Sequence, residues 1–153
     1  MTINTKVSAT DFIPHEKPMI FIDHVLEFGD DFAVAELLIT PELMFCDVQG
    51  LPTWASIELM AQTISLYAGS KGQQLGHTPK IGFLLGTRKL HLPIAYFECG
   101  KTVKITARRQ YLHEGLGQFC CEIQYEDHTI QAMLSVYEPV ELSESKRVNI
   151  ENN

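Results

Sequence analysis

The sequence predicts an α+β fold in which a curved antiparallel sheet wraps around one long central helix. Residues 50–69 are the only long segment whose composition favours a helix over a strand, and they are mostly apolar around the whole circumference. Short β-rich runs separated by turn residues fill the rest of the chain. A helix without a polar face must be covered, and a sheet curved around it provides that cover.

Length and charge narrow the class of protein. The 153 residues fit one domain over 1–153, with an ordered core at about 10–140 and polar tails at both ends. Twelve Lys and Arg face 19 Asp and Glu, a net charge of −7 that argues against binding to nucleic acid or to an anionic membrane. We find no apolar run of membrane-spanning length and no leader pattern, so a cytoplasmic protein is expected.

The elements are expected in a simple order. Two β-rich runs flank Gly29-Asp30-Asp31 and predict a hairpin that Pro41 stops. The helix should begin at Pro52 or Thr53, where Thr can cap free N–H groups, and end at Gly69 or Gly72. The remaining chain predicts strands at 80–92, 101–113, 118–125 and 129–137.

Glu58 is the one charged residue of the predicted helix. It lies in the first two turns among apolar neighbours, where an unpaired buried carboxylate is costly. The carboxyl group must therefore be paired in the structure or used in function. Gln62 follows one turn later and is placed to orient it.

The four cysteines lack the C-x-x-C spacing of a metal or redox motif, so we expect free thiols that pack in the core. They are Cys46, Cys99, Cys120 and Cys121. The histidines also lack ligand spacing, and a zinc site is not expected.

Three segments together carry a family resemblance. They are Ile-Pro-His-Glu-Lys-Pro-Met-Ile-Phe-Ile-Asp-His-Val at 13–25, Ile-Glu-Leu-Met-Ala-Gln at 57–62, and Arg-Lys-Leu-His-Leu-Pro-Ile at 88–94 followed by Gly-Lys-Thr-Val at 100–103. In this order they resemble motifs of the (3R)-3-hydroxyacyl-acyl-carrier-protein dehydratases of the hotdog superfamily. The resemblance implies the hotdog fold and a dimer, because two copies normally pair their sheets edge to edge.

One motif of that family does not match. The family carries a catalytic His in Gly-His-Phe-Pro, fourteen residues before its catalytic Glu, where this chain has Met44-Phe45-Cys46. The helix entry, Leu51-Pro52-Thr53-Trp54, also departs from the family pattern. These departures resemble a divergent branch, the dehydratase-like proteins of aryl-polyene biosynthesis clusters, which are thought to work with a second hotdog subunit.

The resemblance implies water elimination from a 3-hydroxyacyl chain on acyl carrier protein (ACP), without a metal or other cofactor. Glu58 is the expected acid, since burial favours the protonated carboxyl group. N–H groups around Thr53 can polarise the thioester carbonyl. His15 is the first candidate for the base within this chain, although by default it is a loop residue, and Asp47 is a second candidate, although it fits an Asx-type turn better. A third possibility, which the resemblance implies, is a histidine supplied by the partner subunit.

Other residues keep two interpretations. Trp54 packs in the core or lines an acyl tunnel at the mouth of the helix. With Thr53, Gln62 and Asp47 it makes up the expected substrate-binding set. Basic residues on one predicted strand are a solvated face or a docking patch for an acidic carrier: Lys101, Lys104, Arg108 and Arg109.

The sequence thus favours a dehydratase for ACP-bound 3-hydroxyacyl thioesters in fatty-acid or polyene biosynthesis, active alone or only with a partner. Two alternatives stay open, a non-catalytic thioester-binding subunit of a hetero-oligomeric dehydratase and a hotdog thioesterase. The expected partners are an acyl carrier protein and a second hotdog protein, in a homodimer or a heterodimer. Neither nucleic acid nor membrane is among them.

Overall fold

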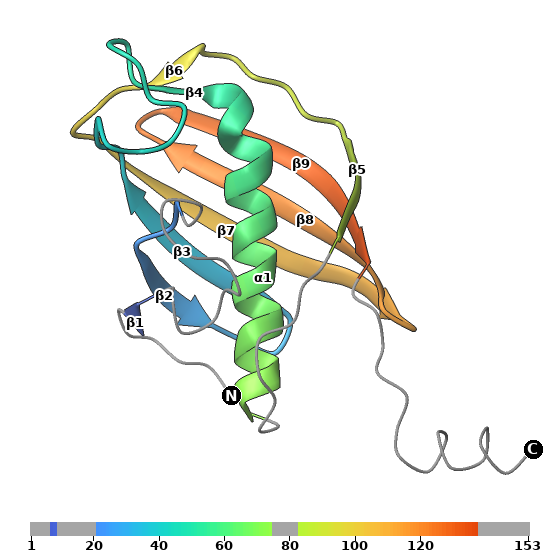
Figure 1. Cartoon of the computed structure of the whole chain (residues 1–153). Helices are drawn as coiled ribbons and strands as arrows, with labels where there is room; N and C mark the ends of the chain where they lie inside the picture. The colour runs from blue at the N-terminus through green and yellow to red at the C-terminus, as the bar shows by residue number, and fades with distance from the viewer. Residues whose placement is uncertain (1–6, 9–20, 75–82, 138–153) are drawn as a thin grey trace, which may run out of the picture.

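The fold is a seven-stranded antiparallel sheet with one long helix across its concave face (Figure 1). The computed structural model describes residues 7–8, 21–74 and 83–137. In spatial order the strands are β1 (Val7–Ser8), β2 (His24–Phe28), β3 (Phe32–Leu38), β7 (Thr102–His113), β8 (Leu116–Tyr125), β9 (His128–Tyr137) and β5 (Phe83–Arg88). Two short strands, β4 (Leu51–Pro52) and β6 (Tyr96–Phe97), pair separately at the end where the helix begins.

The helix is continuous through both glycines that were expected to end it. A 3₁₀ turn, η2 (Thr53–Ala55), leads into α1 (Ser56–Gln74), so the predicted stop at Gly69 or Gly72 is wrong. A glycine inside a helix costs only about 1 kcal/mol relative to Ala. Gly69 is buried in the structure, and the packing around it outweighs that cost.

The register of β7 confirms the predicted alternation. Val103, Ile105 and Ala107 are buried on the face that meets α1, whereas Lys104 between them is exposed. Tight turns connect this strand to β8 and β8 to β9, with a positive φ at Glu114, Gly115 and Glu126. The predicted hairpin before the helix is also present, as β2 paired with β3.

Two details of the prediction need correction. Val7 and Ser8 pair with β2, so this part of the expected N-terminal tail is a strand. The short strands β4 and β6 were not predicted. Most other residues of the two expected tails lie outside the described part of the chain, as do 75–82 before β5.

The helix is not covered on every side in the single chain. One stripe along it is only half-buried: Ile57, Glu58, Ala61, Ser65 and Ala68. The opposite face is closed by β3, β7 and β8 and includes Leu59, Met60 and Leu66, which are fully buried. The expectation of burial around the whole circumference is therefore wrong for the described part of the chain, because its sheet curves around only part of the helix.

Tyr67 connects the second half of α1 to the sheet through two hydrogen bonds. Its hydroxyl donates a hydrogen bond of 2.9 Å to the carbonyl oxygen of Asp30 and accepts one of 2.9 Å from Nη1 of Arg109. Burial raises the pKa of this phenol, and the Arg109 guanidinium opposes the rise. The contact joins the helix, the β2–β3 turn and β7 at one point.

Gly50 sets the approach of the chain to the helix. It has a φ of +124°, and a Cβ there would lie 2.1 Å from the carbonyl oxygen of Phe97 and 3.1 Å from the Cα of Glu98. The backbone before β4 can approach β6 this closely only without a side chain. Gly100 has a φ of +89°, but a Cβ there would meet no atom within 4 Å.

We predict that Gly50→Ala destabilises the fold much more than Gly100→Ala. Both changes force alanine into positive φ, at a cost on the order of 1 kcal/mol each. Gly50→Ala adds a backbone clash, worth roughly a further 1–3 kcal/mol. Urea denaturation followed by circular dichroism measures both, and equal losses would contradict the close approach of Gly50 to β6.

Candidate functional site

Glu58, on the half-buried stripe of α1, forms a polar pair with Gln62, which is buried beneath that stripe. Nε2 of Gln62 donates a hydrogen bond of 3.0 Å to Oε1 of Glu58. Oε1 of Gln62 in turn accepts a hydrogen bond of 2.9 Å from the backbone N–H of Phe21, a residue that is 2% exposed. Because Gln62 itself is buried, it holds one carboxylate oxygen of Glu58 in a fixed direction while the stripe stays open on its outer side.

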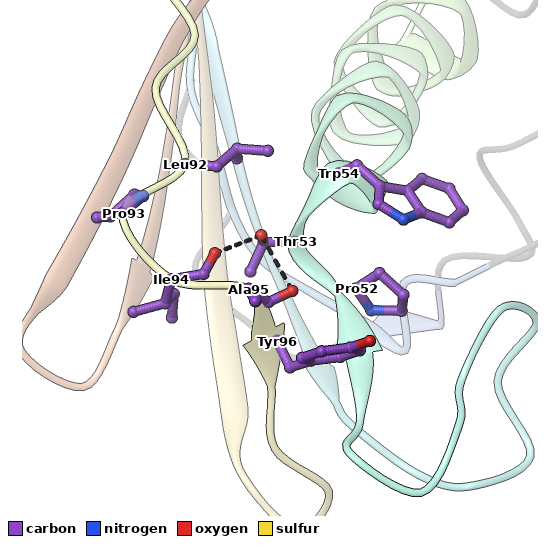
Figure 2. A pocket seen from close by; sticks show the side chains of 8 residues that line it. All are labelled: Pro52, Thr53, Trp54, Leu92, Pro93, Ile94, Ala95 and Tyr96. Atoms are coloured by element: carbon purple, nitrogen blue, oxygen red, sulfur yellow. Dashed lines mark hydrogen bonds between the residues drawn. The ribbon is translucent and has the colours of Figure 1, made fainter.

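Thr53 does not cap the helix as expected. Its Oγ1 donates to the carbonyl oxygen of Ile94 at 2.6 Å and lies 3.3 Å from that of Ala95 (Figure 2). Its backbone N–H also bonds to Ala95, at 2.9 Å. Thr53 thus ties the helix start to the segment before β6, and the start has no side-chain cap. Uncapped N–H groups at a helix start attract a partial negative charge.

A pocket of about 440 Å³ lies between the helix start and the segment leading into β6. Figure 2 shows its two walls, 52–54 on one side and 92–96 on the other. Its lining is mainly apolar: Pro52, Thr53, Trp54, Leu92, Pro93, Ile94, Ala95 and Tyr96. The second wall was missed as part of a site, although its Leu-Pro-Ile sequence carried part of the family resemblance.

Trp54 lies at the rim of this pocket and not in the core. Its side chain belongs to a residue that is 54% exposed, and Figure 2 shows the indole turned away from Leu92 and Pro93. The indole contacts the ring of Phe45, with 5.1 Å between centroids, and Phe45 stacks on Phe21 at 6.0 Å. The core interpretation of Trp54 is therefore wrong, and an aromatic group extends from the rim toward Phe21.

Of the two candidates for the base within this chain, the structure describes Asp47 but not His15. The carboxylate of Asp47 accepts a hydrogen bond of 2.7 Å from the N–H of Gln49, which closes the Asx-type turn. Asp47 is exposed and does not line the pocket. His15 lies outside the described residues, so its role stays a prediction. Within the described part of the chain, the only side chain hydrogen-bonded to Glu58 is that of Gln62.

Most cations of the expected docking patch have partners. Lys101 pairs with Glu126 at 2.8 Å, a contact that raises the pKa of the lysine, and Arg108 lies 3.5 Å from Asp31. Arg109 donates to Tyr67. Of the four, only Lys104 makes no ion pair or hydrogen bond among the described residues, which favours the solvated-face interpretation.

The described residues contain neither a membrane-spanning helix nor a metal-binding cluster. No helix there has the length and apolar character needed to cross a bilayer. Nor do the described residues bring together three or more His, Cys, Asp or Glu side chains in a way that would hold a metal ion.

A model of the ApeP-like family, described as ApeP dehydratase, matches residues 7–147. The chain belongs to the ApeP-like dehydratase family. Among curated proteins no sequence match was found. The matched residues make up most of this ApeP-like chain. They include both walls of the pocket and all of α1.

Solved structures of low sequence identity share the hotdog fold of this ApeP-like chain. The dehydratase heterocomplex ApeI:P from Xenorhabdus doucetiae matches with a TM-score of 0.79 and 22% identity, covering 96% of this chain and 99% of that one. The protein smu.793 from Streptococcus mutans UA159, bound to acetyl CoA, matches with a TM-score of 0.62 and 10% identity over 86% and 98% of the two chains. A hypothetical thioesterase with coenzyme A from Streptococcus pneumoniae TIGR4 gives 0.59 and 12% over 78% and 87%. At these identities the matches establish the fold.

We predict that Gln62→Met destabilises the ApeP-like chain by about 1–3 kcal/mol, because it leaves the buried N–H of Phe21 without its acceptor. The matched control is Gln124→Met, an exposed glutamine on β8, which should change stability by less than about 0.5 kcal/mol. Chemical denaturation of both variants checks the difference. A neutral Gln62→Met would mean that the bond to Phe21 has no net effect on stability.

Proposed function

We propose that this ApeP-like protein acts on 3-hydroxyacyl thioesters carried on acyl carrier protein, in polyene or fatty-acid biosynthesis, and eliminates water to give the trans-2-enoyl thioester. The observation that carries the proposal is the hydrogen bond by which the buried Gln62 holds Glu58 on the half-buried stripe of α1. A carboxyl group with a purely structural role would not need to remain partly accessible to solvent, as Glu58 does. Membership of a dehydratase family supports the same reaction.

In the proposed reaction, a proton leaves C2, a C2–C3 double bond forms and the C3 hydroxyl departs. A base removes a proton from C2, the electron pair left behind forms the C2–C3 double bond, and the C3–O bond breaks. Glu58 gives its proton to the departing hydroxyl, which leaves as water. Because the N–H of Thr53 already bonds to the carbonyl oxygen of Ala95, the N–H groups that follow it in η2 are the proposed donors to the negatively charged thioester oxygen.

Gln62 is the proposed positioning residue. Its amide donates to one oxygen of Glu58, so the other oxygen is the one that carries the proton. The backbone N–H of Phe21 fixes Gln62, and Gln62 in turn fixes the Glu58 side chain. Substrate binding therefore does not have to include the entropic cost of ordering Glu58. The thioester and part of the acyl chain would lie along the apolar walls of the 440 Å³ pocket.

The base is the part that the described residues do not supply. The Asp47 carboxylate already accepts a hydrogen bond within its own turn. Within the described part of the chain, no histidine is hydrogen-bonded to Glu58. We therefore favour a histidine from a second hotdog subunit, with His15 as the alternative from this chain. The heterocomplex named in the Xenorhabdus doucetiae structure supports a partner of this kind.

Two partly exposed apolar surfaces support the proposal that a second hotdog subunit binds this chain. One is the half-buried stripe of α1, which carries Ile57, Ala61 and Ala68 beside Glu58. The other is β5 at the edge of the seven-stranded sheet, where Phe83, Leu84 and Leu85 are 54%, 43% and 59% exposed. An apolar edge strand with unpaired backbone groups is unfavourable in water, and pairing with the edge of another sheet removes the problem.

The charge of the chain supports an acidic carrier close to the pocket. The sequence holds no Asp or Glu between Glu58 and Glu98, although the net charge is −7. In this stretch Arg88, Lys89 and His91 are exposed and directly precede the pocket wall at 92–96. Within the described residues Arg88 and Lys89 make no ion pair, so both remain available to an acidic partner.

We predict that Glu58→Gln lowers dehydration by roughly 10²–10⁴-fold, because the amide cannot donate the proton that the leaving hydroxyl needs. The assay follows enoyl-thioester formation on 3-hydroxyacyl-ACP, with this chain alone and with a hotdog subunit that carries Gly-His-Phe-Pro. Ser65→Ala, on the same stripe, is the matched control and should retain activity. Release of free thiol without enoyl product would favour a thioesterase, and wild-type rates in Glu58→Gln would overturn the proposed acid.

We predict that Leu85→Lys on β5 weakens assembly by at least tenfold in dissociation constant, because it places a charge in an apolar edge that the partner covers. Light scattering after size-exclusion chromatography measures the assembly of the chain alone and with the second subunit. Gln124→Lys on β8, an exposed residue between two paired strands, is the matched control. Unchanged assembly in Leu85→Lys would exclude β5 as the interface.

A further inference from the structure

Two of the four cysteines, far apart in the sequence, lie side by side. The Cys99 thiol lies close enough to Cys46 to be one of the groups that raise the pKa of the Cys46 thiol. Cys46 packs against the core from the loop before β4, whereas Cys99 is exposed in the turn after β6. The expectation that every cysteine is a packing group is correct for Cys46 and Cys121 and wrong for the exposed Cys99 and Cys120.

The backbone holds the two segments together independently of the thiols. Leu51 pairs with Phe97, and Gly50 lies against the backbone of Phe97 and Glu98. The turn that carries Cys99 is fixed at its other end, where Gly100 and Lys101 exchange hydrogen bonds of 2.9 Å each with Ile39. Neither cysteine has to travel far to meet the other.

We propose that Cys46 and Cys99 are an oxidation site that closes to a disulfide in the folded protein. The oxidant we specify is a low-molecular-weight disulfide such as glutathione disulfide. The exposed Cys99 thiolate attacks it and one glutathione thiolate leaves; the Cys46 thiolate then attacks the Cys99 sulfur of the mixed disulfide and releases the second. Two protein thiols lose two protons and two electrons, and glutathione disulfide becomes two glutathiones.

The second step sets the rate. In the reduced protein, burial, then the neighbouring Cys99 thiol and the carboxylates of Asp47 and Glu42, raise the pKa of Cys46 to about 11. Burial and the two carboxylates still raise the pKa of Cys46 when Cys99 carries glutathione. Its thiolate fraction near neutral pH is therefore small and grows about tenfold for each pH unit. Closure should be slow at pH 7 and roughly a hundred times faster at pH 9, which distinguishes this site from an activated redox centre.

Closure of the disulfide would act on the rim of the pocket. Cys46 follows Phe45, a non-glycine residue with a φ of +72°, whose ring contacts Trp54 and Phe21. The bond would fix this ring over the helix start and restrict motion of the loop relative to β6. The formation of the bond does not rest on the proposed function, and only its effect on turnover does.

The test uses the full-length chain with glutathione disulfide at pH 8.5. We expect a species lighter by about 2 Da, from loss of two hydrogens, and a non-reduced peptide map in which Cys46 is linked to Cys99. Cys46→Ser and Cys99→Ala should abolish this species, while Cys120→Ser, the exposed matched control on β8, should form it at the wild-type rate. Because Cys99 is exposed, Cys99→Ala tests the pair even if Cys46→Ser folds poorly.

A second readout follows the loop itself. Trp54 is the single tryptophan of the chain, so its fluorescence reports only on the region that Phe45 contacts. Closure should reduce quenching of Trp54 by acrylamide and raise the melting temperature by roughly 5 °C or more. A stable glutathione adduct on Cys99 without closure, or the lighter species in Cys99→Ala, would overturn the proposal. Neither outcome would affect the assignment of Glu58.

Discussion

The structure depends on how the apolar circumference of α1 is removed from water. The helix has too few polar residues to lie on a surface, and the sheet curves around it because β3, β7 and β8 offer small and branched apolar residues. Each fully buried large side chain contributes roughly 1.5–3 kcal/mol to this packing. One sheet of this size covers only part of the helix, and the stripe that remains carries the one carboxylate.

This incomplete cover connects stability to function. Under the proposed function, the side of α1 that stays half-exposed is where a second subunit would gain apolar contact and where a substrate would reach Glu58. Gln62 serves both the fold and the site, because one end of its amide satisfies the backbone of Phe21 and the other holds the carboxylate. A polar group that is fully bonded inside a core keeps a fixed direction, which an acid needs and an exposed side chain lacks.

The sequence was sufficient for the elements that follow from periodicity. The alternation along 101–113 gave the register of β7, and the apolar run after Pro52 gave the helix and the place of Glu58 within it. It could not give contacts between distant segments. Thr53 has the chemistry of a cap, but the carbonyls of Ile94 and Ala95 lie closer, and nothing local to Thr53 indicates this. The exposure of Trp54 depends in the same way on Phe45, whose positive φ is not visible in the residue type.

The order of the strands has a consequence for how the chain reaches this structure. The strands β7, β8 and β9 are neighbours in the sequence and are joined by tight turns, so their pairing closes only short loops. The pairing of β3 with β7 encloses the whole helix, and β5 must cross from the end of α1 to the far side of β9. Since long loops cost more entropy to close, the three-stranded meander is the natural nucleus, and the helix and the outer strands add to it later. The two walls of the pocket come from these later segments, so the pocket is assembled last and on a sheet that already exists.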